Sequence, residues 1–388
     1  MPVHSPLALP VRAEIDLEAL RRNVRRLAAH VAPAHLMGIV KADAYGHGAV
    51  PVARAMADEG LTWFAVARVD EAVALREAGL TNQMLVLGAP LPADLDAHAA
   101  HSLDLSVTSE AVADAVIAWA GSARQEAGLR VHVKTDTGMH RLGLPPDVVP
   151  RVLTRLYATE GIEVVGLLTH FATADEATSD FASTQTARFD AVLRRLDDAG
   201  VPLPPVVHTA NSGAATLHPR LPVPAGTTTL ARVGGLVYGV PSSPDLVRAA
   251  ATLALEPVLR LVARVVHVQT VAAGETVSYG QTWTAGAPTR IATIAAGYGD
   301  GLPRVLSNVG EAAIDGRRYP IAGRVCMDLT MLDLGAPDGP GGTVQVGDEV
   351  VLLGRGGPSA FEVADRLGTI SYELTTGLTA RVARVLVG

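Results

Sequence analysis

The sequence predicts an α/β fold, with an N-terminal (β/α)8 barrel of the TIM type followed by a mainly β C-terminal domain. Eight short apolar runs, each ending in polar residues or glycine, recur through the first 240 positions. Amphipathic, helix-like segments lie between most of these runs, and such alternation favours a parallel sheet closed into a barrel. Beyond about residue 245 the pattern changes to short strand-like runs separated by glycine-rich turns, which is typical of an all-β domain.

The chain is long enough for two domains. Its 388 residues exceed the ~250–300 at which a single hydrophobic core stops growing. We expect the barrel at 1–245, the mainly β domain at 246–388, and the junction within 239–250.

The elements expected in the barrel begin with a helix over 15–30. Its N-cap is Asp16, and Leu20, Val24 and Leu27 follow at helical spacing. The eight expected strands are 35–41, 63–68, 83–90, 103–109, 130–136, 164–170, 205–211 and 229–239. Helix-like patterns between them cover 69–80, 109–121 and 181–200.

The elements expected in the second domain are mostly strands. A mixture of valine and arginine over 256–271 predicts a strand, because its alternation does not have a helical period. Shorter strand-like runs follow at 290–295, 310–315, 317–323, 327–335 and 344–354. Helical patterning returns at 361–368 and 375–386.

Composition argues against several classes of function. Hydrophobic residues make up 48% of the chain and charged residues 18%, which suits a large core. A net charge of −7 without a basic block gives no reason to expect a nucleic-acid partner. Cys326 is the single cysteine, the N-terminus lacks the pattern of a secretory signal, and no apolar run reaches the ~18 residues of a membrane span. We therefore expect a cytoplasmic protein without a membrane segment, and the histidine spacing predicts no metal site.

Lysine usage is the most informative single feature. The chain has 32 lysines and arginines, but only Lys41 and Lys134 are lysines. Arginine supplies positive charge equally well, but it does not give the neutral primary amine that forms a Schiff base with a carbonyl. The two remaining lysines are therefore candidates for amine chemistry.

Polar side chains follow several of the predicted barrel strands. They are Lys41, Lys134 with Asp136, His170, Asn211 with Ser212, and Arg232. Because active sites of such barrels lie at the carboxyl ends of the strands, we expect these side chains to converge. The loops after the last two strands, 210–214 and 233–239, carry glycine, and loops at this position commonly bind phosphate. A Schiff-base lysine beside a phosphate site suggests pyridoxal phosphate as cofactor.

Nine motifs in collinear order resemble the alanine racemases, a pyridoxal-phosphate family of fold type III. They are VKADAYGHG (40–48), DTGMHRLG (136–143), THFATAD (169–175), HTANSGA (208–214), ARVGGLVYG (231–239), VSYGQTW (277–283), AGYGDGLPR (296–304), GRVCMD (323–328) and SYE (371–373). The resemblance spans nearly the whole chain. It implies a barrel plus a β domain, a homodimer with shared active sites, and D-alanine supply for peptidoglycan.

The resemblance also implies roles for single residues around the cofactor. Lys41 is similar to the cofactor lysine, which is also a base on one face of the substrate. Tyr279 of the partner chain is similar to the base on the opposite face. Arg232 resembles the residue that faces the pyridine nitrogen, with His170 between it and Tyr279. The remaining cofactor-binding positions that the motifs indicate are Tyr45, Asn211, Ser212, Gly234 and Tyr372.

A second group resembles substrate-binding residues. Arg141 and Met327 match residues that meet the substrate carboxylate, with Met327 coming from the partner chain. Lys134 matches a lysine that is often carbamylated to N6-carboxylysine in this family and then holds Arg141. The positions similar to residues of the entry corridor are Asp175, Tyr298, Arg304 and Arg324. Gly235 stands where a larger aliphatic residue is common in the family.

The chemistry of racemisation explains why two bases are needed. A proton must leave one face of Cα and return on the other, so Lys41 and Tyr279 should flank that carbon. A tyrosine with a pKa near 10 needs cationic neighbours to act as a base, and we expect Arg232 and His170 to be those cations. An arginine at the pyridine nitrogen should leave that nitrogen unprotonated.

Other functions remain open at this point. A racemase of broader amino-acid specificity or a pyridoxal-phosphate decarboxylase on the same fold would share most of these residues, although a decarboxylase should place a carboxylate where Arg232 stands. A barrel aldolase would form the Schiff base directly with its substrate. A cofactor-binding protein without catalysis would keep Lys41 but has no need for Tyr279.

Overall fold

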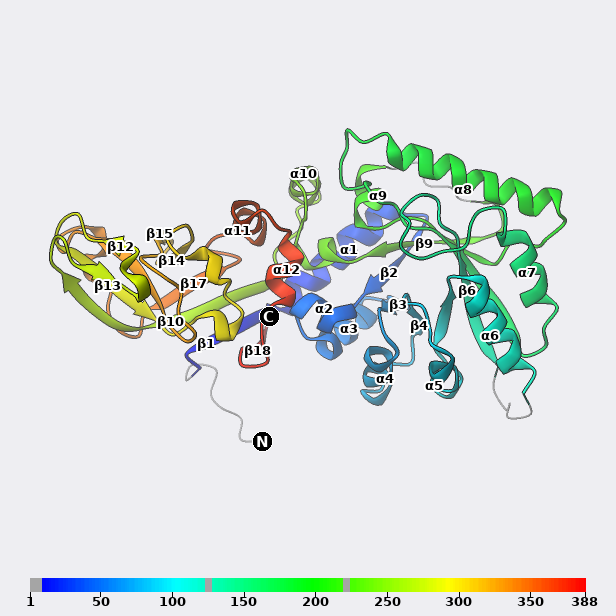
Figure 1. The fold of residues 1–388 in the computed structure, drawn as a ribbon, viewed down its shortest axis with the longest axis horizontal. Coiled ribbons are helices and arrows are strands. Elements are labelled where there is room, and N and C mark those ends of the chain that lie inside the picture. Colours follow the sequence, from blue (N-terminus) through cyan, green and yellow to red (C-terminus); the bar gives the residue numbers. More distant parts are fainter. Residues whose placement is uncertain (1–8, 123–127, 219–223) are drawn as a thin grey trace.

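The computed structural model describes residues 9–122, 128–218 and 224–388. Segment 1–8, where the sequence predicts no secretory signal, lies outside the described residues. A barrel and a β domain lie side by side along the long axis, and the long strand β10 runs from between them into the β domain (Figure 1). Among the described residues, no helix is both long and apolar enough to span a membrane.

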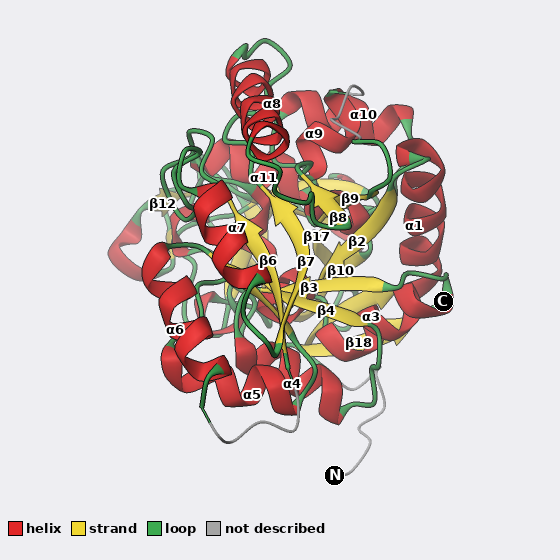
Figure 2. Cartoon of the chain, turned by 90° about the vertical axis from the view of Figure 1, so that its right-hand side faces the viewer, coloured by secondary structure: helices red, strands yellow, loops and turns green. Residues whose placement is uncertain are grey.

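The predicted barrel is confirmed: eight parallel strands close in sequence order, from β2 to β9 and back to β2 (Figure 2). Their bounds are β2 His35–Ile39, β3 Trp63–Val66, β4 Gln83–Val86, β5 Asp104–Val107, β6 Leu129–Lys134, β7 Ile162–Leu168, β8 Val206–His208 and β9 Thr228–Val233. All eight lie within or next to the predicted ranges. The last predicted range was too long, because a 3-10 turn over Gly235–Tyr238 follows β9.

Helices surround this barrel (Figure 2). The first, α1 (Leu17–Val31), has the predicted N-cap, because Asp16 Oδ1 accepts the Ala19 N–H at 2.8 Å. The others are α2 Lys41–Gly46, α3 Ala49–Asp58, α4 Val69–Glu77, α5 Leu95–Ala100, α6 Glu110–Ala120, α7 Val149–Tyr157, α8 Phe181–Asp198, α9 Ser212–Leu217 and α10 Pro244–Thr252. Helix α10 occupies the segment in which the sequence predicted a junction.

The β domain is built on one mixed sheet that includes the first strand of the chain. Strand β1 (Val11–Asp16) pairs antiparallel with β10 (Leu259–Val271) and parallel with β18 (Ala383–Val387). The same sheet contains β13 Thr289–Ile294, β14 Glu311–Ile314, β15 Arg317–Pro320, β16 Thr330–Gly335 and β17 Glu349–Leu353. Strands β11 Thr276–Val277 and β12 Trp283–Thr284 form a separate two-stranded sheet. The helices are α11 Ala360–Leu367 and α12 Ser371–Thr376.

The helical prediction for 375–386 was wrong over most of its length. Only its first two residues belong to α12, and its last four belong to β18. The arginines and valines of this segment continue the sheet beside β1, a partner more than 350 positions away that local periodicity does not reveal.

A close contact between two helices attaches the segment after the β domain to the barrel. Helix α12 contacts α2 at the barrel mouth. There Gly46 approaches the helix so closely that a Cβ on it would lie 2.0 Å from the Thr375 carbonyl oxygen, and its φ of +83° also favours glycine. Residues after the β domain therefore reach the carboxyl ends of the barrel strands. The division of domains at residue 245 stays a prediction.

Candidate active site

A cavity of about 520 Å³ opens at the carboxyl ends of the barrel strands. The side chains predicted to follow strands converge on it, except for Asp136, which does not line the cavity. Those lining it are Lys41, Lys134, His170, Asn211, Ser212 and Arg232. Five further residues that the motifs indicated also line it: Tyr45, Arg141, Asp175, Gly234 and Tyr372.

Lys41 begins a turn of unusual backbone conformation. The four residues after it, 42–45, are not glycine, yet their φ angles lie between 51° and 56° with positive ψ. Left-handed conformation costs an L-residue roughly 1–2 kcal/mol. Two carboxylates hold the turn: Glu71 Oε1 accepts the Ala42 N–H at 2.5 Å, and Asp43 Oδ1 accepts the Ala49 N–H at 2.7 Å. The turn carries both Lys41 and Tyr45 to the cavity.

Glu71 is a residue that sequence reasoning missed. Its second oxygen, Oε2, accepts the backbone N–H groups of Ala67 and Arg68 at 2.8 and 3.0 Å. One carboxylate therefore joins the loop after β3 to the Lys41 turn. The available signal was the acidic pair at the start of α4, which alone indicates only a helix cap.

The environment of Lys41 favours the neutral amine. Burial lowers the pKa of Lys41 below its ordinary value, and the Arg141 cation lowers that pKa further, while the negative charge of Glu71 acts in the opposite direction. A lower pKa leaves more of the unprotonated amine, which is the form that attacks a carbonyl.

Arg232 is fixed by backbone carbonyl groups. Its guanidinium donates through Nη1 to the His208 carbonyl at 2.6 Å and through Nη2 to the carbonyls of Thr169 and Thr209 at 2.7 and 3.1 Å. Burial lowers the pKa of Arg232 to about 9, so it remains a cation at neutral pH. The structure thus presents a rigid positive charge at the cavity wall.

His170 is the nearest ring to this cation, and the expectation that it is itself cationic was wrong. Its Nδ1 lies 3.1 Å from Arg232 Nη2. Burial, together with the charges of Arg232 and Lys134, keeps the pKa of His170 well below its ordinary value. Because an arginine nitrogen can only donate, Nδ1 is the acceptor and the proton of the neutral ring is on Nε2.

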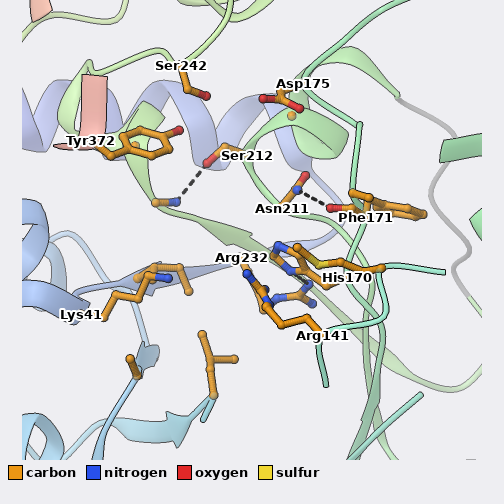
Figure 3. Close-up of a pocket in the computed structure, with 18 of the residues that line it drawn as sticks. Lys41, Arg141, His170, Phe171, Asp175, Asn211, Ser212, Arg232, Ser242 and Tyr372 are labelled. Carbon is orange, nitrogen blue, oxygen red and sulfur yellow. Dashed lines mark hydrogen bonds between the residues drawn. The ribbon is translucent and has the colours of Figure 1, made fainter. Parts of the chain in front are cut away.

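Tyrosine, serine and glycine residues form the other end of the cavity. Figure 3 shows Tyr372, Ser212 and Ser242 at one end and Lys41, Arg232, Arg141 and His170 at the other. Ser212 Oγ accepts the Gly234 N–H at 3.0 Å. Burial raises the pKa values of Tyr45 and Tyr372, so both hydroxyl groups keep their protons at neutral pH. This end offers neutral hydrogen-bond donors.

The two glycines here leave room for those rings. A Cβ on Gly234 would lie 2.5 Å from the Tyr45 hydroxyl, and one on Gly235 would lie 2.1 Å from Tyr372 Cε1. An aliphatic side chain at position 235 therefore does not fit beside Tyr372 as it is placed here.

Asn211 lines the cavity but is engaged in local structure. Its Oδ1 caps α9 by accepting the Ala214 N–H at 3.0 Å, and its Nδ2 donates to the Phe171 carbonyl at 3.3 Å (Figure 3). Its role in cofactor binding stays a prediction.

Lys134 and Arg141 lie on the cation side of the cavity. Burial, together with Arg232 and Arg141, lowers the pKa of Lys134 to about 8. Between them, Asp136 Oδ1 accepts the backbone N–H groups of Gly138 and His140 at 2.8 and 3.1 Å, which orders the loop leading to Arg141. A lysine with this pKa is partly neutral near physiological pH.

The predicted site residues of the β domain do not line this cavity. Tyr279 is 73% exposed and Met327 is 52% exposed. Ser278, with φ of +69°, and Gly280, with φ of +72°, flank Tyr279 in a tight turn that holds it outward. Tyr298, Arg304 and Arg324, predicted for the entry corridor, also belong to this domain and do not line the cavity.

Comparison with known proteins assigns both parts of the chain to one family. Residues 15–242 match the family model of the alanine racemase N-terminal domain, and residues 258–386 match that of the alanine racemase C-terminal domain. The chain is 40% identical over 381 residues to the alanine racemase of Desulforamulus reducens, covering 98% of this chain and 99% of that protein. Against the alanine racemase of Beutenbergia cavernae, the identity is 42% over 393 residues, with 98% and 99% covered.

Solved structures agree with the sequence matches. The crystal structure of the alanine racemase from D-cycloserine-producing Streptomyces lavendulae superposes with a TM-score of 0.88 at 36% identity, covering 99% of this chain and 98% of that one. The alanine racemase from E. faecalis gives the same TM-score at 34% identity, with 98% of each chain covered. Because both family models match and its relatives are similar in sequence and fold over nearly its full length, this chain belongs to the alanine racemase family.

Proposed function

We propose that this protein interconverts L-alanine and D-alanine with pyridoxal 5'-phosphate as its cofactor. One observation carries the proposal: a primary amine of lowered pKa, a buried arginine and a glycine-lined end with tyrosine and serine hydroxyl groups share one cavity. Membership of the alanine racemase family supports the same reaction.

The residues present fit this cofactor. Lys41 supplies the amine that an aldehyde requires, while Ser212 and Tyr372 supply donors for a phosphate at the opposite end (Figure 3). Tyr45, whose hydroxyl group lies next to Gly234, supplies a third donor. Gly234 and Gly235 have no side chain that would displace the two tyrosine rings. Arg232 would face the pyridine nitrogen. When bound, pyridoxal phosphate withdraws electrons from the substrate Cα–H bond and so makes that proton acidic.

Two bases would then move the proton between the faces of Cα. Lys41 serves one face from within the barrel. Tyr279 serves the other face from the partner subunit, and its exposure at the surface of the β domain is consistent with a partner that covers it. In this homodimer Arg141 and Met327, the latter again from the partner, would bind the substrate carboxylate.

His170 can assist Tyr279 although it is neutral. Arg232 occupies its Nδ1 as a donor, so the Nε2–H is free to donate to the tyrosine oxygen. A hydrogen bond to a phenolate stabilises its charged form and lowers the pKa of a tyrosine. The positive charge that the sequence suggested for His170 is therefore supplied by Arg232 behind it.

Lys134 would be carbamylated to N6-carboxylysine. Carbamylation needs a neutral amine that attacks carbon dioxide, and a pKa of about 8 supplies it at moderate pH. The reaction replaces a cation by an anion beside Arg141 and Arg232, which relieves repulsion among them. Electron density of the folded enzyme at neutral pH tests this: we expect one added carboxyl group on Lys134, and an unmodified lysine would contradict it.

The reaction itself is tested with L-alanine in deuterated water. We expect D-alanine that carries solvent deuterium at Cα, together with an absorption band that borohydride bleaches while labelling Lys41. Release of carbon dioxide would instead indicate a decarboxylase, and faster turnover of other amino acids would indicate a racemase of broader specificity. A labelled Lys41 without any exchange at Cα would indicate a binding protein.

Dimer formation and cellular role extend the same proposal. Sedimentation should show twice the chain mass, and mixing a Lys41 variant with a Tyr279 variant should restore activity, because the mixed dimer contains one complete site. We further propose a cytoplasmic enzyme that supplies D-alanine for peptidoglycan.

A further inference from the structure

Three buried polar side chains inside the barrel lead away from Arg232. His208 is the last residue of β8, His132 lies in the middle of β6, and Asp104 is the first residue of β5. All three are completely buried. They descend from the barrel mouth toward its amino-terminal end, a region where hydrophobic side chains normally fill such barrels.

Short contacts connect the four groups. Arg232 Nη1 lies 3.3 Å from His208 Nδ1, His208 Nε2 lies 2.9 Å from His132 Nδ1, and His132 Nε2 lies 3.1 Å from Asp104 Oδ2. Arg130 Nε donates to the other oxygen of Asp104 at 2.7 Å. This series of hydrogen bonds therefore begins at the buried Arg232 cation and ends at an ion pair in which Asp104 is buried and Arg130 is partly exposed.

Only one arrangement of protons satisfies every link. Arg232 can only donate, so His208 Nδ1 accepts and the proton of His208 is on Nε2. That proton is donated to His132 Nδ1, so the proton of His132 is on its own Nε2 and is donated to the Asp104 carboxylate. Burial keeps the pKa of His208 well below its ordinary value, which agrees with a neutral ring. Reversing either ring would place two donors against each other.

The carboxylate state of Asp104 agrees with this direction. Burial alone would raise the pKa of Asp104, but the hydrogen bonds from His132 and Arg130, together with the positive charge of Arg130, outweigh burial and leave the pKa below its ordinary value. Asp104 is thus an acceptor with both oxygens, and the direction of the hydrogen bonds is fixed at the far end as well as at Arg232.

The fold makes space for these rings. On β7, a Cβ at Gly166 would lie 2.1 Å from His132 Nδ1, so no other residue fits there without moving the ring. The register between β6 and β7 also shifts here, from Val131 opposite Val164 to His132 opposite Gly166. The glycine at position 166 and the register shift between β6 and β7 occur at the same point, which indicates that the fold provides a defined space for the His132 ring.

We infer that Asp104, His132 and His208 are positioning residues that fix the orientation of the Arg232 guanidinium at the cavity wall. Among the residues that the structure describes, no carboxylate pairs with Arg232 at the mouth, and the hydrogen bonds through His208 and His132 connect it to Asp104 at the other end of the barrel. This inference rests on the proposed function only in that Arg232 would face the cofactor.

The proton arrangement is tested without any variant. Neutron diffraction of the loaded enzyme locates hydrogens, and we expect one on Nε2 and none on Nδ1 of both His132 and His208. A proton on Nδ1 of either ring would overturn the inference. The result does not depend on the substrate, so it stands apart from whether alanine is racemised.

The functional consequence is tested with His132→Phe, which keeps a ring but removes both links. We expect kcat to fall about tenfold, the usual effect of losing a charge-linked hydrogen bond, with KM nearly unchanged because Arg232 binds no substrate. The absorption band of the bound cofactor should shift as well. His132→Gln can accept from His208 and donate to Asp104, so it should restore both properties to within about threefold.

The matched control is His98→Phe. His98 is also a buried histidine near Asp104, but its Nδ1 contacts the Leu103 carbonyl at 3.2 Å. It takes no part in the hydrogen bonds that connect Arg232 to Asp104. We expect a loss of stability without a change in kcat or absorption. Equal effects of the two His→Phe variants on kcat, or wild-type kcat in His132→Phe, would overturn the inference. Should His132→Phe not fold, neutron diffraction still decides.

Discussion

The barrel mouth and the outer face of the β domain carry the predicted site residues in opposite environments. At the mouth, Arg232 is 3% exposed and bonded to three carbonyl groups, and burial has already shifted the pKa values of Lys41 and Lys134. On the β domain, Tyr279 and Met327 are largely exposed. One chain thus contains the preorganised half of the proposed site, and in the proposed homodimer the other half would come from a second copy.

Lys41→Arg should have the largest effect, because it removes the amine while keeping the charge. We expect activity to fall by roughly 10⁵-fold, since catalysis by a positioned covalent group is lost. Borohydride should no longer attach the cofactor to the protein. Retained labelling at another lysine, which could only be Lys134, would show that the two lysines have been assigned the wrong way round.

Tyr279→Phe tests the exposed half of the comparison. Loss of one acid–base group should lower turnover by about 10³-fold. Because phenylalanine keeps the aromatic ring and loses only the hydroxyl group, the melting temperature should stay near the wild-type value, unlike that of variants in the buried half. Cofactor labelling at Lys41 should also persist. If the Tyr279→Phe enzyme racemised alanine at the wild-type rate, Tyr279 of the β domain would not be the second base.

Gly235→Ala should have a smaller effect, confined to the cofactor. A Cβ would lie 2.1 Å from Tyr372 Cε1, so the ring must move away from the cavity. We expect the dissociation constant for pyridoxal phosphate to rise about tenfold, as for loss of one hydrogen bond. Gly286→Ala is the control, since its Cβ would meet nothing within 4 Å. Equal affinities in the two variants would show that Tyr372 does not hold the cofactor.

The same comparison explains what the sequence could predict. The eight barrel strands were visible because each is a short local run, and the end of a strand locates Lys41, His170 and Arg232 once the barrel is recognised. Strands β1 and β18 were not visible, because each is stabilised by partners hundreds of positions away. Local patterns carry no information about such pairing.

Other features of the site depend on packing that no local pattern reports. The neutral state of His170 follows from burial beside cations, whereas its sequence context only places it after a strand. His132 and His208 are single residues inside apolar strands, and their connection requires the closed barrel. The left-handed turn after Lys41 contains two alanines, an aspartate and a tyrosine, and it lacks the glycine that usually indicates such backbone.

The left-handed turn after Lys41 gives the smallest expected effect. A glycine substitution there should change the stability of the protein in the opposite direction from a glycine substitution in a right-handed helix. Ala42 is exposed and has φ of +51°, so Ala42→Gly should remove strain and stabilise the protein by about 1 kcal/mol. Ala111 is exposed in the right-handed helix α6, so Ala111→Gly should destabilise by about 1 kcal/mol. Melting temperatures of the loaded enzymes, read against wild type, should therefore move in opposite directions. If both fall, the backbone at Lys41 holds no strain that glycine relieves, and the turn is stable in its own right.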